Sequence, residues 1–152
     1  MNRPPSPEPL DGARPARVVH RSRVEWMDTD AAGHHHNTAV VRYVEAAEAE
    51  LMRTLGITGY FGAAPRVRYE ADFTAPLWFG QEVTTELTVE SIGTTSVTLR
   101  FEIRAEDGRP AASGRYVAVH VPRGERTSTP WPAAWVEAWS SGAGSSGKGN
   151  GV

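Results

Sequence analysis

The clearest pattern along the chain is a helical one that ends at a glycine. Apolar side chains recur at spacings of three and four residues, at Val40, Val44, Ala47, Leu51 and Leu55. Such spacings stack on one face of a helix that has 3.6 residues per turn. Gly56 follows directly, and glycine at this position commonly ends a helix in the left-handed conformation. The pattern predicts a helix over Thr38–Leu55, about 27 Å long at 1.5 Å rise per residue.

Much of the remaining chain alternates between apolar and polar side chains, which is typical of strands with one buried face. The alternation runs over Arg17–Met27, Arg66–Phe73, Val83–Glu90, Val97–Arg104 and Ala111–Val121. Asp107 and Gly108 precede the last stretch, and this dipeptide favours a tight hairpin turn. Strands joined by short turns pair antiparallel. The Trp131–Trp139 segment is expected to close the fold with a short helical turn at most.

This order of one strand, one helix and four strands predicts an α+β fold. One long helix would pack on one face of a curled antiparallel sheet of about five strands. A single helix covers only part of such a sheet, and the edge strands would be left open. Joining two sheets edge to edge relieves both problems, so a homodimer is expected from the pattern.

Composition indicates a single globular domain with atypical ends. Of the 152 residues, 39% are hydrophobic and 22% are charged, which is sufficient for a buried core. Residues 1–16 contain five of the eleven prolines, and residues 140–152 are nearly all Gly and Ser. We therefore expect a disordered arm over 1–16, one domain over 17–139 and a flexible tail over 140–152.

Charge and cysteine content argue against several classes of protein. The net charge is −2 without a basic run, so nucleic acid is not expected as a partner. No apolar run approaches the ~18 residues of a membrane span, and the Pro-rich start lacks the apolar core of a signal peptide. We expect no membrane partner and a cytoplasmic location. Cysteine is absent, which excludes disulfides and thiol catalysis.

Titratable side chains concentrate in the turn before the predicted helix. This turn holds two carboxylates, a glycine, three histidines and an asparagine: Asp28, Asp30, Gly33, His34, His35, His36 and Asn37. The first turn of a helix has free N–H groups and a partial positive charge, which together can hold an oxyanion. A carboxylate near a carbonyl and a donor for the developing charge are what thioester hydrolysis needs, without a metal.

Some of these residues also have a structural interpretation. Asp28 and Asp30 can each bond their own backbone in a turn. Gly33, Asn37 and the adjoining helix favour a chemical role for Asp30, whereas both roles stay open for Asp28. Consecutive histidines on a turn rarely converge on one ion, and no carboxylate or cysteine stands at a familiar ligand spacing. We expect neither a metal nor another cofactor.

Three stretches resemble a known family. Asp28-Thr29-Asp30-Ala31-Ala32-Gly33-His34, followed by Asn37 and a helix bearing Tyr43 and Glu45, is similar to the DTDxxGH…N signature of hotdog-fold acyl thioesterases. These enzymes form the 4-hydroxybenzoyl-CoA thioesterase-like group. Residues 71–83 resemble the "F…PL..G" turn of that family, and residues 91–96 resemble its "IG..S" hairpin. The similarity covers Arg17–Pro132 in order and spacing.

The resemblance implies a hotdog fold in which the sheet wraps the central helix. Two chains would share one sheet, with active sites at the dimer interface of a homodimer or homotetramer. It implies an acyl thioesterase acting on an acyl-CoA or acyl-carrier-protein thioester. Asp30 matches the catalytic acid, as nucleophile or general base, and the backbone N–H of Asn37 would point at the thioester oxygen.

Other site residues follow from their closeness to the motif or from their aromatic character. His34 is expected to order the turn and His36 to line the site. Glu45 is a further catalytic candidate because some hotdog enzymes carry their acidic residue on the helix. The expected substrate-binding residues are Gly33, His34, Trp26, Tyr60, Phe61 and Trp78, with Phe79 as a further pocket wall.

The thioester carrier and the reaction each leave alternatives open. The hairpin over residues 92–96 lacks Lys and Arg, which some CoA-using relatives place there, so an acyl carrier protein stands beside CoA. One alternative function is a hotdog protein that binds an acyl group without hydrolysis or assists polyketide or lipid assembly. Another is a hotdog dehydratase, which would use a His and an acid on opposite chains.

Overall fold

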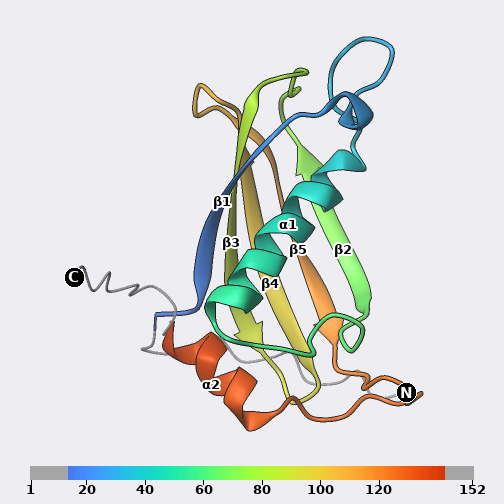
Figure 1. Ribbon diagram of the computed structural model, residues 1–152, viewed down its shortest axis with the longest axis vertical. Coiled ribbons are helices and arrows are strands. Elements are labelled where there is room, and N and C mark those ends of the chain that lie inside the picture. The colour runs from blue at the N-terminus through green and yellow to red at the C-terminus, as the bar shows by residue number, and fades with distance from the viewer. Residues whose placement is uncertain (1–13, 143–152) are drawn as a thin grey trace, which may run out of the picture.

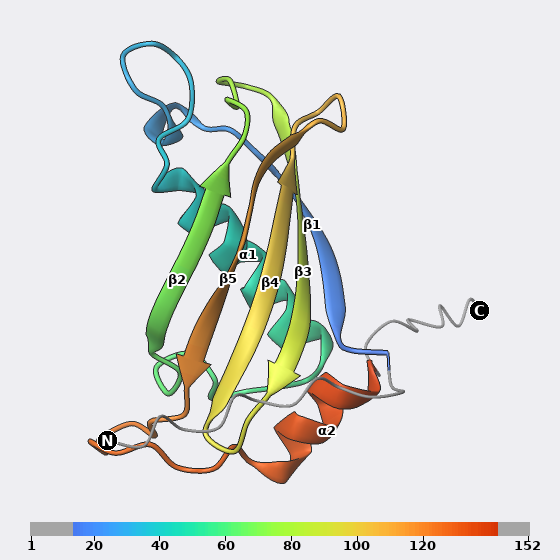
Figure 2. The ribbon, with the colours of Figure 1, turned by 180° about the vertical axis from the view of Figure 1, so that it is seen from behind.

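The computed structural model describes residues 14–142, so most of the expected arm and tail lies outside the described residues. Its five strands form one antiparallel sheet in the order β1-β3-β4-β5-β2. Helix α1 crosses one face of this sheet, and α2 lies near the end of the sheet where α1 ends (Figure 1). The other face carries neither helix (Figure 2). This arrangement confirms the predicted α+β class with a five-stranded antiparallel sheet.

The elements follow the predicted order. The strands are β1 (Arg17–Arg23), β2 (Arg66–Phe73), β3 (Glu82–Ile92), β4 (Ser96–Arg104) and β5 (Pro110–Val119). The helices are the 3-10 turn η1 (Trp26–Asp28), α1 (Ala39–Thr54) and α2 (Ala133–Ser141). Neither α1 nor α2, the α-helices within residues 14–142, has the length and hydropathy needed to cross a membrane.

Two of the predicted elements are corrected. The first strand ends at Arg23 rather than Met27, because the chain turns into η1 and the Asp28 carboxylate bonds back to the Glu25 N–H. The segment expected to form a short turn at most carries the nine-residue helix α2. This helix is held by tertiary packing, since Trp139 is fully buried.

Helix α1 packs through the predicted apolar face. Val40, Val44, Ala47 and Leu51 are almost fully buried against the inward faces of the strands. Thr38 and Leu55, the predicted ends, are the residues that cap the 16-residue helix. Gly56 has a φ of 70°, the left-handed conformation expected of a glycine that ends a helix. The spacing of apolar residues therefore located this helix to within its caps.

Aromatic side chains close the end of the sheet beside α2. Tyr60, Trp131, Trp135 and Trp139 contact one another with ring centroids 5.0–6.2 Å apart. Ala16 joins this end, because its N–H donates to the Trp139 carbonyl at 2.9 Å. The cluster stabilises the end of the molecule opposite the turn that precedes α1.

Candidate functional site

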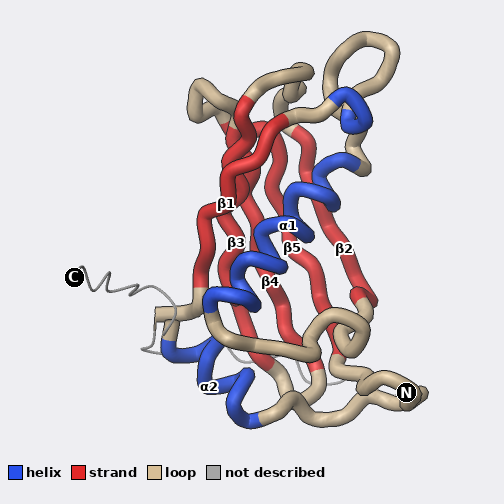
Figure 3. Tube along the Cα trace, viewed as in Figure 1, coloured by secondary structure: helices blue, strands red, loops and turns tan. Residues whose placement is uncertain are grey.

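Residues 28–37, hereafter the motif turn, lie beside the loop that joins β2 and β3 (Figure 3). His34 forms an isolated bridge with Trp78, and the His35 N–H donates to the Leu77 carbonyl at 2.8 Å. The Phe79 N–H donates to the Gly33 carbonyl at 3.1 Å. These backbone bonds fix the motif turn on a second loop, although no sequence pattern links the two loops.

Asp30 both forms the turn and remains accessible. Its Oδ1 accepts a hydrogen bond from the Ala32 N–H at 2.8 Å, and its backbone N–H donates to the His34 carbonyl at 3.0 Å. Its Oδ2 lies 3.7 Å from His34 Nε2, and the Asp30 side chain is 36% exposed. One carboxylate oxygen is thus held by the turn, while the other accepts no hydrogen bond from the described residues and has the His34 ring as its neighbour.

The start of α1 offers free backbone donors beside the motif turn. Within residues 14–142, the N–H groups of Asn37 and Thr38 have no hydrogen-bond partner. The Thr38 side chain makes no capping bond, and the first turn holds no acidic residue. Because the helix dipole adds partial positive charge there, these N–H groups can bind an oxyanion.

The three histidines occupy different environments. His34 is half-buried and meets the Trp78 ring edge to face, with centroids 5.6 Å apart. His35 is buried, and its Nδ1 accepts a hydrogen bond from the Leu77 N–H at 2.9 Å. His36 is exposed and helps to line a shallow hollow of about 210 Å³ at the helix start. No group of three or more His, Asp or Glu side chains suited to a metal ion occurs in the described part of the chain.

Asp28 differs from Asp30 in being buried and fully bonded. Its carboxylate accepts hydrogen bonds from the Glu25 N–H, both arms of the Arg42 guanidinium and the Tyr43 hydroxyl. Burial opposes its ionisation, but the bonds from Arg42 and Glu25 outweigh burial and hold the pKa of Asp28 below its usual value. This residue therefore remains a structural anion.

The aromatic residues expected to line one pocket lie near opposite ends of α1. Trp26 and Trp78 flank the motif turn and are 68% and 45% exposed. Tyr60 and Phe61 lie in the loop after α1, where Tyr60 is buried in the aromatic cluster. Because the 16 residues of α1 separate the ends by about 24 Å, one chain does not bring all four together.

Glu45 lies on α1 away from the motif turn and is exposed. It forms an ion pair with Arg66, with the Glu45 Oε1 and Arg66 Nη1 atoms 3.7 Å apart. Glu48, one turn further, is fully buried and accepts hydrogen bonds from Arg66, Tyr60 and Tyr116. Burial raises the pKa of Glu48, while Tyr116, Arg66 and Tyr60 act in the opposite direction. The sequence analysis did not identify this cluster. The feature that could have indicated it is a Glu within the apolar face of the predicted helix.

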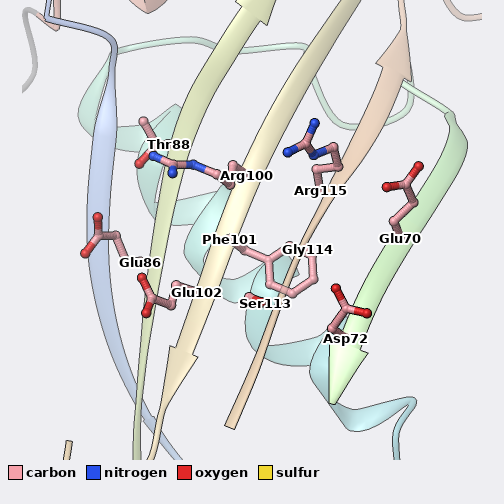
Figure 4. Close-up of a pocket in the computed structure, with 10 residues that line it drawn as sticks. All are labelled: Glu70, Asp72, Glu86, Thr88, Arg100, Phe101, Glu102, Ser113, Gly114 and Arg115. Atoms are coloured by element: carbon pink, nitrogen blue, oxygen red, sulfur yellow. The ribbon is translucent and has the colours of Figure 1, made fainter. Parts of the chain in front are cut away.

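A hollow on the surface lies on the sheet face opposite α1 (Figure 4). Its volume is about 500 Å³, and its side chains belong to β2–β5. The lining residues are Glu70, Asp72, Glu86, Thr88, Arg100, Phe101, Glu102, Ser113, Gly114 and Arg115. It contains none of the predicted site residues, so the motif turn remains the candidate functional site.

The relatives found by comparison with known proteins agree with one another, because they are thioesterases or CoA-thioester hydrolases. The profile of the Thioesterase-like superfamily matches residues 24–139. A 1,4-dihydroxy-2-naphthoyl-CoA hydrolase of Prochlorococcus marinus (strain MIT 9303) is 30% identical over 133 residues, 78% of this chain and 88% of that protein. A Thermus thermophilus thioesterase, solved with coenzyme A and Zn, is 27% identical with a TM-score of 0.71, over 84% of this chain and 93% of that one. A 1,4-dihydroxy-2-naphthoyl-CoA thioesterase from Synechocystis has the same fold, with 22% identity and a TM-score of 0.74, over 81% and 95%.

Proposed function

The chain belongs to the Thioesterase-like superfamily, and from that premise we propose that it hydrolyses an acyl-CoA thioester at the motif turn. The family match and a relative that is a CoA-thioester hydrolase confirm the resemblance to hotdog acyl thioesterases. The relatives' names specify CoA thioesters or coenzyme A, so CoA is favoured here over an acyl carrier protein.

The proposal is supported by an accessible carboxylate in the motif turn and by free N–H groups at the point where the same turn enters α1. Asp30 keeps one oxygen available, and the N–H groups of Asn37 and Thr38 have no partner among the described residues. The carboxylate either takes a proton from a water that attacks the thioester carbonyl carbon, or attacks that carbon itself to form an acyl–Asp30 anhydride, which water then hydrolyses. The carbonyl oxygen, which becomes negative, is stabilised by the helix N–H groups until the thiolate of CoA leaves.

Residues around Asp30 set its position and its surroundings. His34 lies close to the free carboxylate oxygen, at 3.7 Å, and also packs on Trp78. Gly33 has a φ of 84°, a conformation that side chains disfavour, so the tight turn behind Asp30 depends on this glycine. Trp26 and Trp78 provide apolar surface for the acyl group or the pantetheine arm. His36 lines the approach to the helix start.

The proposal includes a second copy of the chain, which would complete the site. Strand β2 is an edge of the sheet and leaves Val67 and Phe73 exposed. Antiparallel pairing of two β2 strands would make one continuous sheet around two central α1 helices, as in a hotdog dimer. The loop before β2 of one copy would then meet the motif-turn end of the other. Phe61, which is 55% exposed, would reach the partner's acyl group in this way.

The proposed activity is tested by following thiol release from a panel of acyl-CoA and acyl-carrier-protein thioesters. The panel includes aromatic and fatty acyl groups, because the exposed rings of Trp26 and Trp78 offer apolar surface to either kind. We expect CoA thioesters to be hydrolysed, and the preferred acyl group to be identified by kcat/KM. Binding of acyl-CoA without thiol release would instead support the non-hydrolytic alternative.

A further inference from the structure

Asp28 is a buried carboxylate that the proposed chemistry does not use. Its side chain is 3% exposed. Its Oδ2 accepts from the Glu25 N–H at 2.8 Å and the Tyr43 hydroxyl at 3.2 Å, and its Oδ1 accepts from Arg42 Nε at 2.7 Å. Arg42 and Tyr43 belong to α1, so this carboxylate joins the motif turn to the helix that carries the free N–H groups.

Arg42 connects three separate segments. Its guanidinium bonds both oxygens of Asp28, and Nη2 also donates to the Arg23 carbonyl, at the end of β1, at 3.3 Å. The same group lies over the Tyr43 ring, 4.9 Å from its centroid. A positive charge in the first turn of a helix opposes the helix dipole, and Asp28 compensates for that charge.

The backbone of Asp28 is anchored as firmly as its side chain. Its carbonyl accepts a hydrogen bond from the His36 N–H at 2.7 Å, so both ends of the motif turn are tied together across Asp30. If Asp28 only shaped the turn, the hydrogen bond that it accepts from the Glu25 N–H would be sufficient. The bonds to α1 instead set where the Asp30 carboxylate lies relative to the helix start.

We propose that Asp28 and Arg42 form a positioning pair that holds Asp30 at a fixed place relative to the N–H groups at the start of α1. This role rests on the proposed thioester hydrolysis. A displacement of about 1 Å in a reacting group can cost about 10²-fold in rate. Loosening this pair therefore affects the chemical step more than it affects substrate binding.

The test compares the kcat and KM of Asp28→Asn and Arg42→Lys on the best acyl-CoA substrate of the wild type. Asp28→Asn removes the charge at constant size, and Arg42→Lys keeps the charge but loses the two-armed bond. We expect kcat to fall about tenfold or more for the first variant and by a smaller factor for the second, with KM within about twofold. Arg42→Lys decides the question alone if Asp28→Asn does not fold.

Glu48→Gln is the matched control, because Glu48 is a second buried carboxylate and lies on α1, with its partners in β2, β5 and the loop after α1. It is expected to lower the melting temperature without lowering kcat. Unchanged kcat in both pair variants, with Asp30→Asn inactive, would overturn the positioning role and leave the proposed function intact. An equal loss of kcat in Glu48→Gln would also overturn it, since general destabilisation would then suffice. Full turnover in Asp30→Asn would overturn both proposals.

Discussion

His35 is buried in a form that cannot readily take up a proton. Its Nδ1 accepts a hydrogen bond from the Leu77 N–H, and its buried Nε2 has no partner among the described residues. Burial, assisted by the neighbouring His34, lowers the pKa of His35. Protonation would also remove the acceptor that holds Leu77, so the loop beside the motif turn depends on neutral His35.

We expect acid to destabilise the protein through His35. Below about pH 6.5, the ordinary histidine value, the unfolded chain binds a proton at this residue while the folded chain resists it. The free energy of unfolding therefore falls as the pH is lowered from about 7 to about 5. His35→Gln keeps an acceptor for the Leu77 N–H and does not titrate, so its loss should be smaller. Urea denaturation at both pH values measures the difference, and equal losses in the two proteins would contradict the prediction.

The sequence located the motif turn but could not assign its individual residues. Asp28 and Asp30 have the same local turn options, and only the fold brings Arg42 against Asp28, 14 positions along the chain. The histidines are equally ambiguous, because the 77–79 segment decides which ring is buried. Of the three, His35 is the buried one, which the run of identical residues does not indicate.

The Glu48 cluster fixes α1 against the edge strand of the sheet. Arg66 of β2 and Tyr116 of β5 both donate to the Glu48 carboxylate. The Arg66 guanidinium also lies over the Tyr116 ring, 5.0 Å from its centroid. This cluster is the polar link between the helix and the strand that we propose as the dimer edge.

Loss of the Glu48 carboxylate should destabilise the fold strongly. Glu48→Ala leaves Arg66 partly buried without its main partner, and breaking a buried pair in this way typically costs about 3–5 kcal/mol. Glu45→Ala removes the exposed partner of the same arginine and should cost less than about 1 kcal/mol. Urea denaturation of both variants provides the comparison, and similar losses would show that the buried cluster does not hold α1.

The two α-helices differ in how well the sequence predicted them. The apolar spacing of α1 determines its packing face, so the predicted bounds match its caps. The segment that forms α2 lies after Pro130 and Pro132 and has no clear apolar stripe. Its helix depends on contacts of Trp139 with Trp131 and with Tyr60, which lies some 80 positions earlier in the chain. Such tertiary contacts are not visible in a local pattern.

The proposed dimer explains why the aromatic residues expected in one pocket lie at both ends of α1. Trp26 and Trp78 flank the motif turn, whereas Phe61 is exposed at the opposite end. A twofold axis through paired β2 strands reverses one copy relative to the other. Phe61 of one copy would then complete the site that contains Asp30 of the other copy.

A mixing experiment tests this shared site. Asp30→Asn and Phe61→Asp chains are each expected to have low activity alone. When the two are unfolded and refolded together in equal amounts, random pairing makes about half of the dimers mixed, each with one intact site. About one quarter of the wild-type activity should then appear. A mixture no more active than its separate components, or a monomer by light scattering, would contradict the shared site.

We propose that the accessible carboxylate of Asp30 carries out thioester hydrolysis with the N–H groups at the start of α1. The most direct measurement is the turnover of Asp30→Asn on the best acyl-CoA substrate, with Asp72→Asn on the opposite sheet face as the matched control. Asp30→Asn keeps the size and turn-forming ability of the side chain but removes the base or nucleophile. We predict a fall in kcat of at least about tenfold with an unchanged melting temperature, and no fall for Asp72→Asn. Near wild-type turnover in Asp30→Asn would show that Asp30 is not the reacting carboxylate and would move the chemistry to another carboxylate, most directly Glu45.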